Sequence, residues 1–169
     1  YEIELRLKKE GDVVTSAKQR LTVIGVELPK QKIMHTEWMH ADCLADYYHV
    51  DVFSEEHWKI LENYFKEYVK RGCNMMLTPL FTSPLDTAVG LERTTTQLIK
   101  VEVVKGEYRF EFSELKRWID LCKKCGIEYY EMSHLFSQWG AKYAPKVVAE
   151  VDGKEEKIFG WHTQAVGEY

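Results

Sequence analysis

The chain has 169 residues, of which 45% are hydrophobic and 30% are charged, a composition typical of folded globular proteins and not of disordered ones. Its formal net charge of -4 provides no basic surface for a phosphate backbone, so we expect no nucleic-acid partner. No apolar run approaches the roughly 18 residues of a membrane-spanning helix, so we expect no membrane partner.

The first 30 residues are β in character. Ile3, Leu5 and Leu7 alternate with polar residues, the period of a half-buried strand. Residues 21–28 predict a second, more buried strand, and no helix pattern precedes residue 54. Two strands do not form a stable sheet alone. We therefore expect residues 1–30 to belong to a larger β domain.

Strand and helix patterns alternate after residue 31. Strands are predicted over 32–38, 74–77 and 127–132, with a polar-aromatic loop after the first. One helix begins after Ser54, a favourable N-cap, and the other after Ser113; Gly72 and Gly126 end them. Hairpins are predicted over 98–112, turning at Lys105-Gly106, and near the end of the chain, turning at Asp152-Gly153.

This order predicts an α/β fold with a parallel sheet. It corresponds to about three βα units with inserted hairpins, a partial (β/α)8 TIM barrel over residues 31–169. A complete barrel needs about 250 residues, so we expect the chain to be a fragment.

Four cysteines are present, at positions 43, 73, 122 and 125. Only Cys122 and Cys125 have a motif spacing, and they come just before Gly126, a predicted helix end, where a redox pair would precede a helix start. A structural zinc would need a second pair. We expect reduced thiols and no cofactor, which weakly favours a cytoplasmic location.

Active sites of (β/α) barrels lie on the loops after the strands. Here those loops are rich in hydrogen-bonding and aromatic side chains, a combination that suits sugar hydroxyls and the C–H faces of sugar rings. The candidate ligand contacts are Trp38, His40, Asp42, Asp86, Arg93, His134, Gln138 and Trp139. The alternative for each is a structural role in a hydrogen-bonded loop or in the core.

Other chemistry is less well supported by the spacing. His35, His40, Asp42 and His49 are suitable metal ligands but form no recognised metal motif. Asp42, Asp86 and Glu131 contain carboxylates that a glycosidase pair could use, but nothing singles out two of them. Trp58 and Trp118 lie on apolar helix faces, and we expect both in the core.

Several longer runs carry a family resemblance. They are W-M-H-A-D-C-L-A-D-Y-Y (38–48), F-S-E-E-H-W (53–58), T-P-L-F-T-S-P-L-D-T (78–87), E-R-T-T-T-Q-L (92–98), S-H-L-F-S-Q-W-G-A-K-Y-A-P-K (133–146) and F-G-W-H-T (159–163). Over residues 30–163 the chain resembles the bacterial glycoside hydrolase family 123-like group and its relatives annotated only as a domain of unknown function. Residues 1–30 are similar to the last strands of that family's N-terminal β-sandwich.

The resemblance implies a β-sandwich followed by a catalytic (β/α)8 barrel. It also implies a retaining β-N-acetylgalactosaminidase in which the substrate's 2-acetamido group is the nucleophile, assisted by an adjacent Asp-Glu pair. The chain contains no Asp-Glu dipeptide. We therefore expect substrate-binding loops without catalytic residues, and a chain that is inactive alone.

The partner implied is an amino-sugar glycoside. Two alternatives remain open: a barrel protein that binds carbohydrate without cleaving it, and a metal-dependent hydrolase that uses the His/Asp cluster. Uncovered barrel edges would also favour self-association.

Overall fold

The structure is a computed structural model that describes residues 1–30, 32–138 and 140–166. The chain divides into two compact units, Tyr1–Lys32 and Ile33–Tyr169.

The first unit is a hairpin. Strands β1 (Glu2–Lys9) and β2 (Asp12–Arg20) pair antiparallel, with an irregularity between Leu7 and Lys8. The turn uses Glu10 and Gly11, both at positive φ (53° and 97°), as the right-handed twist of a tight hairpin favours. The predicted first strand is present. The predicted strand over 21–28 is wrong, because the local turn pairs β1 with residues 12–20 instead.

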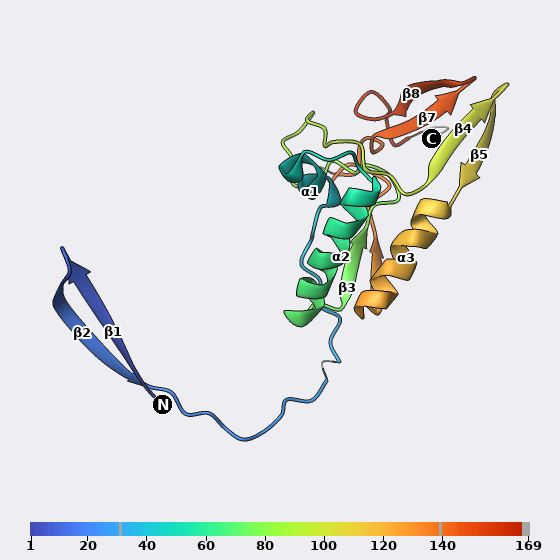
Figure 1. The fold of residues 1–169 in the computed structure, drawn as a ribbon. Helices are drawn as coiled ribbons and strands as arrows, with labels where there is room; N and C mark the ends of the chain where they lie inside the picture. Colours follow the sequence, from blue (N-terminus) through green and yellow to red (C-terminus); the bar gives the residue numbers. More distant parts are fainter. Residues whose placement is uncertain (31, 139, 167–169) are drawn as a thin grey trace. The chain divides into compact units, whose positions relative to one another are not determined.

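The second unit is built around a parallel strand pair. Strands β3 (Met75–Thr78) and β6 (Tyr129–Met132) pair in parallel, from Met75 opposite Tyr129 to Thr78 opposite Met132. Helices α2 (Glu55–Lys70) and α3 (Ser113–Cys125) each precede one of these strands and cover one face of the pair (Figure 1).

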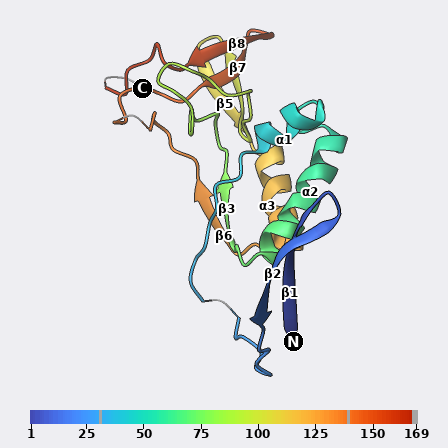
Figure 2. The ribbon, with the colours of Figure 1, turned by 90° about the vertical axis from the view of Figure 1, so that its left-hand side faces the viewer.

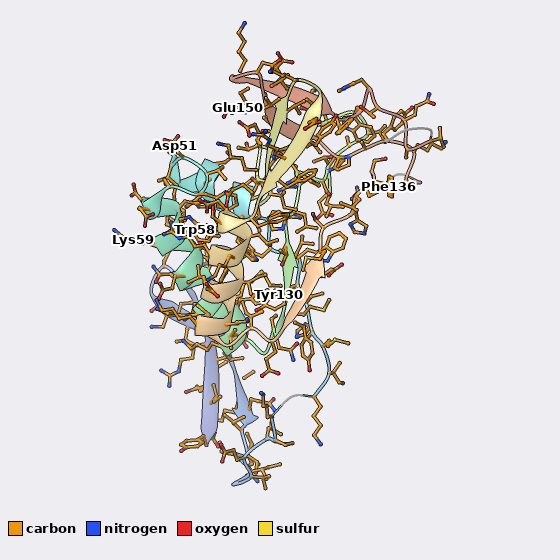
Figure 3. All side chains as sticks on the ribbon, turned by 90° about the vertical axis from the view of Figure 1, so that its right-hand side faces the viewer. Asp51, Trp58, Lys59, Tyr130, Phe136 and Glu150 are labelled. Atoms are coloured by element: carbon orange, nitrogen blue, oxygen red, sulfur yellow. The ribbon has the colours of Figure 1, made fainter. Side chains whose placement is uncertain are left out.

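The core lies between these helices and β3. Trp118, Phe65 and Leu61 are fully buried there, and the Phe65 and Trp118 rings meet edge to face at 5.0 Å between centroids. Trp58 (Figure 3) is 4% exposed, and the Arg117 guanidinium lies 4.6 Å from the centroid of its ring. The prediction that both helical tryptophans are in the core is therefore confirmed. None of the helices described combines the length and the apolarity that crossing a bilayer requires.

The helix ends follow local chemistry. Ser54 Oγ accepts the His57 backbone N–H at the start of α2, as its N-cap position predicts. Gly126 ends α3 in the left-handed region (φ 98°), which a residue without Cβ adopts freely. Phe112, not Ser113, occupies the N-cap position of α3. There the Glu111 carboxylate accepts both the N–H and the hydroxyl of Ser113, which lowers the Glu111 pKa.

A four-stranded sheet lies beyond the ends of β3 and β6 (Figure 2). Its order is β5 (Glu107–Glu111), β4 (Lys100–Val104), β7 (Val147–Val151) and β8 (Lys154–Phe159). Both predicted hairpins are present, and they join through a parallel pairing of β4 with β7. A small apolar cluster of Val101, Val147 and Ala149, with Phe81 packed against it, stabilises this sheet.

The prediction of a partial (β/α)8 TIM barrel preceded by β-sandwich strands is wrong for the residues described. They form small separate sheets of two, two and four strands, with three helices and no barrel. The predicted alternation of strands and helices along the chain is present. The alternation alone does not predict that the two hairpins pair with each other, which they do through β4 and β7. Every described residue of the N-terminal hairpin is exposed, and within the described residues β1 and β2 pair only with each other.

The segment before α1 also departs from prediction. Residues 33–38 are not a strand, although the His35 carbonyl accepts the N–H groups of Asn74 and Met75. The Tyr68 hydroxyl bonds the backbone N–H and carbonyl of Glu37, and therefore replaces ladder hydrogen bonds. Helix α1 (Ala41–Tyr48) occupies part of the predicted loop. This helix has eight residues and no side-chain N-cap hydrogen bond, so the sequence shows little of the helical periodicity or capping that predicts a helix.

His57 connects α1 to α2. Its Nδ1 accepts the Phe53 N–H at 2.9 Å, and its Nε2 lies 3.0 Å from the Ala41 carbonyl oxygen. A carbonyl only accepts, so Nε2 carries the proton and the ring is neutral. Burial lowers the His57 pKa, against the opposing effects of the Ala41 carbonyl and the Asp42 carboxylate.

This arrangement predicts a pH-dependent stability. Unfolded His57 takes up a proton near pH ~6.5, whereas the folded protein binds it only at lower pH, so stability falls as the pH drops below that value. One such proton contributes at most about 1.4 kcal/mol per pH unit. In urea unfolding between about pH 7.5 and 5.5, we expect His57→Gln to be less stable but to have a shallower pH dependence than wild type. The exposed His162 is the control, because His162→Gln should keep the wild-type slope. An unchanged slope in His57→Gln would contradict the neutral buried ring.

Candidate functional site

Three loops meet at the carboxyl ends of the parallel strands. They are residues 38–42, which lead into the first turn of α1, residues 79–96 after β3, and residues 133–138 after β6, and all lie on the side of the strand pair that faces the four-stranded sheet (Figure 2). Since β3 and β6 are parallel, their ends bring the second and third loops together. The Ser83 hydroxyl donates to the His134 carbonyl, and Ser133 Oγ accepts the Leu80 N–H.

The first group of site residues is a buried ion pair. Arg93 Nε donates to Asp42 Oδ2 at 2.9 Å, and the two side chains are only 11% and 8% exposed. Arg93 Nη1 donates to the Leu85 carbonyl and Nη2 to Cys43 Sγ, each at 2.9 Å. The guanidinium therefore joins the start of α1 to the loop after β3.

Lys146, at the start of β7, holds the backbone of Arg93. Its Nζ donates to the Arg93 carbonyl, and its side chain is 12% exposed. Burial lowers the Lys146 pKa, partly offset by the charge of Glu92. Backbone hydrogen bonds in both directions between Lys146 and Thr82 fix β7 to the same loop.

The second group is a histidine–carboxylate pair. His40 Nε2 lies 2.7 Å from Asp86 Oδ2, with the His40 side chain 14% and the Asp86 side chain 60% exposed. The Asp86 backbone N–H donates to Gln138 Oε1 at 3.1 Å. One residue from each loop therefore contributes to this group.

The third group surrounds an exposed indole. Trp38 is 40% exposed, and its Nε1–H donates to Glu131 Oε2 at 3.0 Å. His134 meets the Trp38 ring edge to face, with centroids 5.7 Å apart. Leu135 and Phe136, also exposed, follow in the same loop, and Figure 3 shows Phe136 away from the helices. The Trp38 ring is therefore open to solvent but held in one orientation.

A small cavity lies beneath these groups. Its volume is about 30 Å³, and its lining includes His40, Asp42, Ser83, Arg93 and Ser133. That space holds on the order of one water molecule. The cavity is therefore too small for a sugar ring, and a sugar bound by these loops would contact their exposed side chains instead.

The metal-ligand alternative finds no support in the geometry. His35 Nε2 lies 3.2 Å from Glu37 Oε1, and His40 Nε2 pairs with Asp86 Oδ2. His49 is the C-cap residue of α1. Within the parts of the chain that the structure describes, no three His, Cys, Asp or Glu side chains are grouped to hold a metal ion.

The predicted candidates thus fall into different environments. Those open to solvent are Trp38, Asp86 and His134, those partly buried are His40 and Gln138, and the nearly buried ones are Asp42 and Arg93. Trp139 lies outside the described residues. Two contributors were not among the candidates: Glu131, considered only as a possible catalytic carboxylate, and Cys43. The contact of Glu131 with Trp38 could not be predicted from a local sequence pattern, because the two residues are 93 positions apart.

The family described as glycoside hydrolase 123, catalytic domain, matches residues 38–168. A solved family 123 glycoside hydrolase from Clostridium perfringens, described in connection with glycolipid glycan hydrolysis, is similar at 22% identity with a TM-score of 0.53. The similarity covers 73% of this chain and 22% of that protein, so the chain spans about a fifth of its length. No curated protein sequence matches.

The buried ion pair predicts a large stability effect. Asp42→Ala leaves the Arg93 guanidinium buried without its carboxylate, which typically costs about 3 kcal/mol or more. Glu55, 76% exposed and paired with Arg117, is the control, because loss of a solvent-exposed ion pair in Glu55→Ala should destabilise the protein much less than loss of the buried one. Urea unfolding measures both free energies. Similar losses in the two variants would show that the Asp42–Arg93 pair is not buried as described.

Proposed function

This chain belongs to the glycoside hydrolase 123 catalytic-domain family, and we propose that its three loops bind the sugar of a glycoside substrate. A glycoside hydrolase family has carbohydrate as its substrate class. The carboxyl ends of parallel strands are also the common place for ligands in α/β proteins. The proposed contacts are Trp38, His40, Asp86, His134, Gln138 and Trp139, whereas Asp42 and Arg93 form the buried ion pair.

The observation that carries the proposal is the exposed, oriented indole of Trp38. An aromatic ring that is open to solvent can stack against the apolar face of a ligand. The hydrogen bond to Glu131 and the edge contact with His134 fix the ring before any ligand arrives. A fixed ring loses little conformational entropy on binding, so it offers a flat surface for the C–H face of a sugar at low cost.

Polar groups on the same three loops suit the edge of a sugar ring. Asp86 exposes most of its carboxylate while keeping its bond to His40, so one face of the pair remains available to a hydroxyl. His134 lies in the exposed loop next to Trp38. Sugar hydroxyls both donate and accept, and a carboxylate with imidazoles supplies both partners.

We assign the chain substrate binding and not proton transfer to the leaving group. The family resemblance places that chemistry on an adjacent Asp-Glu pair, and the sequence has no Asp-Glu dipeptide. An amino-sugar glycoside, and a retaining mechanism assisted by its acetamido group, are proposed from the same resemblance. A second candidate is a carbohydrate-binding protein that does not hydrolyse its ligand, and an Asp-Glu pair in the native gene product would count against it. Turnover of an aryl N-acetyl-β-galactosaminide by the native gene product would exclude it.

Sugar binding should depend on Trp38. We expect methyl N-acetyl-β-galactosaminide to bind, with Trp38→Ala raising the Kd about fivefold, since an aromatic contact contributes on the order of 1 kcal/mol. Glu131→Gln keeps an oxygen acceptor for the indole N–H and should stay within about twofold of wild type. NMR titration measures each Kd.

Phe110→Ala is the control. It removes another exposed aromatic ring, from β5, and should leave the Kd unchanged. The proposal fails if wild type does not bind the glycoside, or if Trp38→Ala binds it as tightly as wild type does.

A further inference from the structure

We infer that Arg93 is a positioning residue: it fixes the backbone that presents Asp86 and the helix start that presents His40, and does not itself contact the substrate. The consequence for sugar binding rests on the proposed function. The geometric part concerns the loop alone and can be tested without a ligand.

The peptide unit between Leu85 and Asp86 is held from both sides. Its carbonyl accepts Arg93 Nη1 at 2.9 Å, and its N–H donates to Gln138 Oε1 at 3.1 Å. Because the peptide unit is planar and does not rotate freely about its C–N bond, these two hydrogen bonds fix the orientation of the whole unit. The direction in which the Asp86 side chain leaves the backbone is therefore set by two residues from different loops.

Asp86 needs this support because of its backbone conformation. Its φ is 56°, in the left-handed region that residues with a Cβ rarely adopt. Aspartate tolerates that region better than most, but such residues persist only where their surroundings impose the conformation. Arg93 and Gln138 supply that restraint, and the resulting direction brings Asp86 Oδ2 to 2.7 Å from His40 Nε2.

The other arm of Arg93 fixes His40. Asp42 is in the first turn of α1, and His40 is the N-cap residue that precedes the helix. His40 makes no side-chain cap bond, so the helix start must be held by other contacts. Arg93 Nε bonds Asp42, and Nη2 bonds Cys43. One guanidinium thus sets both members of the His40–Asp86 pair relative to each other.

Arginine suits this task and lysine does not. The planar guanidinium points its donors in fixed directions toward three acceptors, whereas an ammonium is a single point charge on a flexible stem. All three nitrogens of Arg93 already have protein partners, and the side chain is 11% exposed. Little of it remains for a ligand.

The test is Arg93→Lys, which keeps the charge beside Asp42 but loses the directed bond to the Leu85 carbonyl. We expect the Asp86 amide to exchange with solvent at least about tenfold faster, while core amides such as that of Phe65 change less than about twofold. The Kd for methyl N-acetyl-β-galactosaminide should rise by a similar factor. Gln138→Ala releases the same peptide from its other side without disturbing the ion pair, and should accelerate Asp86 exchange likewise. Arg109→Lys, at an arginine 65% exposed on β5, is the matched control and should change neither.

Each contrary result is decisive. If the Asp86 amide exchanges at the wild-type rate in both Arg93→Lys and Gln138→Ala, the two hydrogen bonds do not fix the Leu85–Asp86 peptide unit, and the inference is overturned. A higher Kd in Arg93→Lys with an unchanged exchange rate of the Asp86 amide would indicate that Arg93 contacts the ligand directly. Faster exchange with an unchanged Kd would remove the link to binding. If wild type binds no glycoside, the proposed function fails, while the exchange rates still decide whether Arg93 positions the loop.

Discussion

The hydrogen bonds of the Arg93 guanidinium are the constraint on which the arrangement of the loops depends. Three segments that share no secondary structure meet there: the first turn of α1, the loop after β3 and, through Lys146 and the Arg93 carbonyl, the start of β7. Burying so much charge is costly unless each group is paired, and here Arg93 has an acceptor at every nitrogen. The gain is a fixed geometry more than stability, because a buried ion pair often contributes little net free energy.

Local chemistry predicted the local structure well. Ser54 starts α2, Gly126 ends α3, and both glycine turns form hairpins. Pairings between distant segments could not be predicted, since nothing in residues 98–112 indicates that β4 will lie beside β7. For the same reason the expected barrel did not appear. Helix α1 was missed because an eight-residue helix with His40 as an uncapped N-cap carries almost no periodic pattern.

The candidate site shows the same division. The sequence placed Trp38, His40, Asp86, His134 and Gln138 on loops after strands, and the structure brings these loops together. The sequence alone could not distinguish the residues that face solvent from the buried residues that support them. That separation comes from burial: Asp42 and Arg93 are under one-eighth exposed, whereas Asp86 is more than half exposed. A similar division between supporting and presenting residues is found in well-formed binding sites generally, where a packed outer shell orients the groups that touch the ligand.

The long sequence separation of the Arg93 contacts has a consequence for folding. Arg93 meets Asp42 and Cys43 across about 50 positions, and Lys146 meets Arg93 across 53. Closing such loops costs chain entropy before any contact compensates for it, so local structure generally forms first. The hairpins and single helices should therefore form before the three loops are joined. Until the loops join, the His40–Asp86 pair is only a set of separate side chains, and a chain halted at that stage would have its helices and no binding surface.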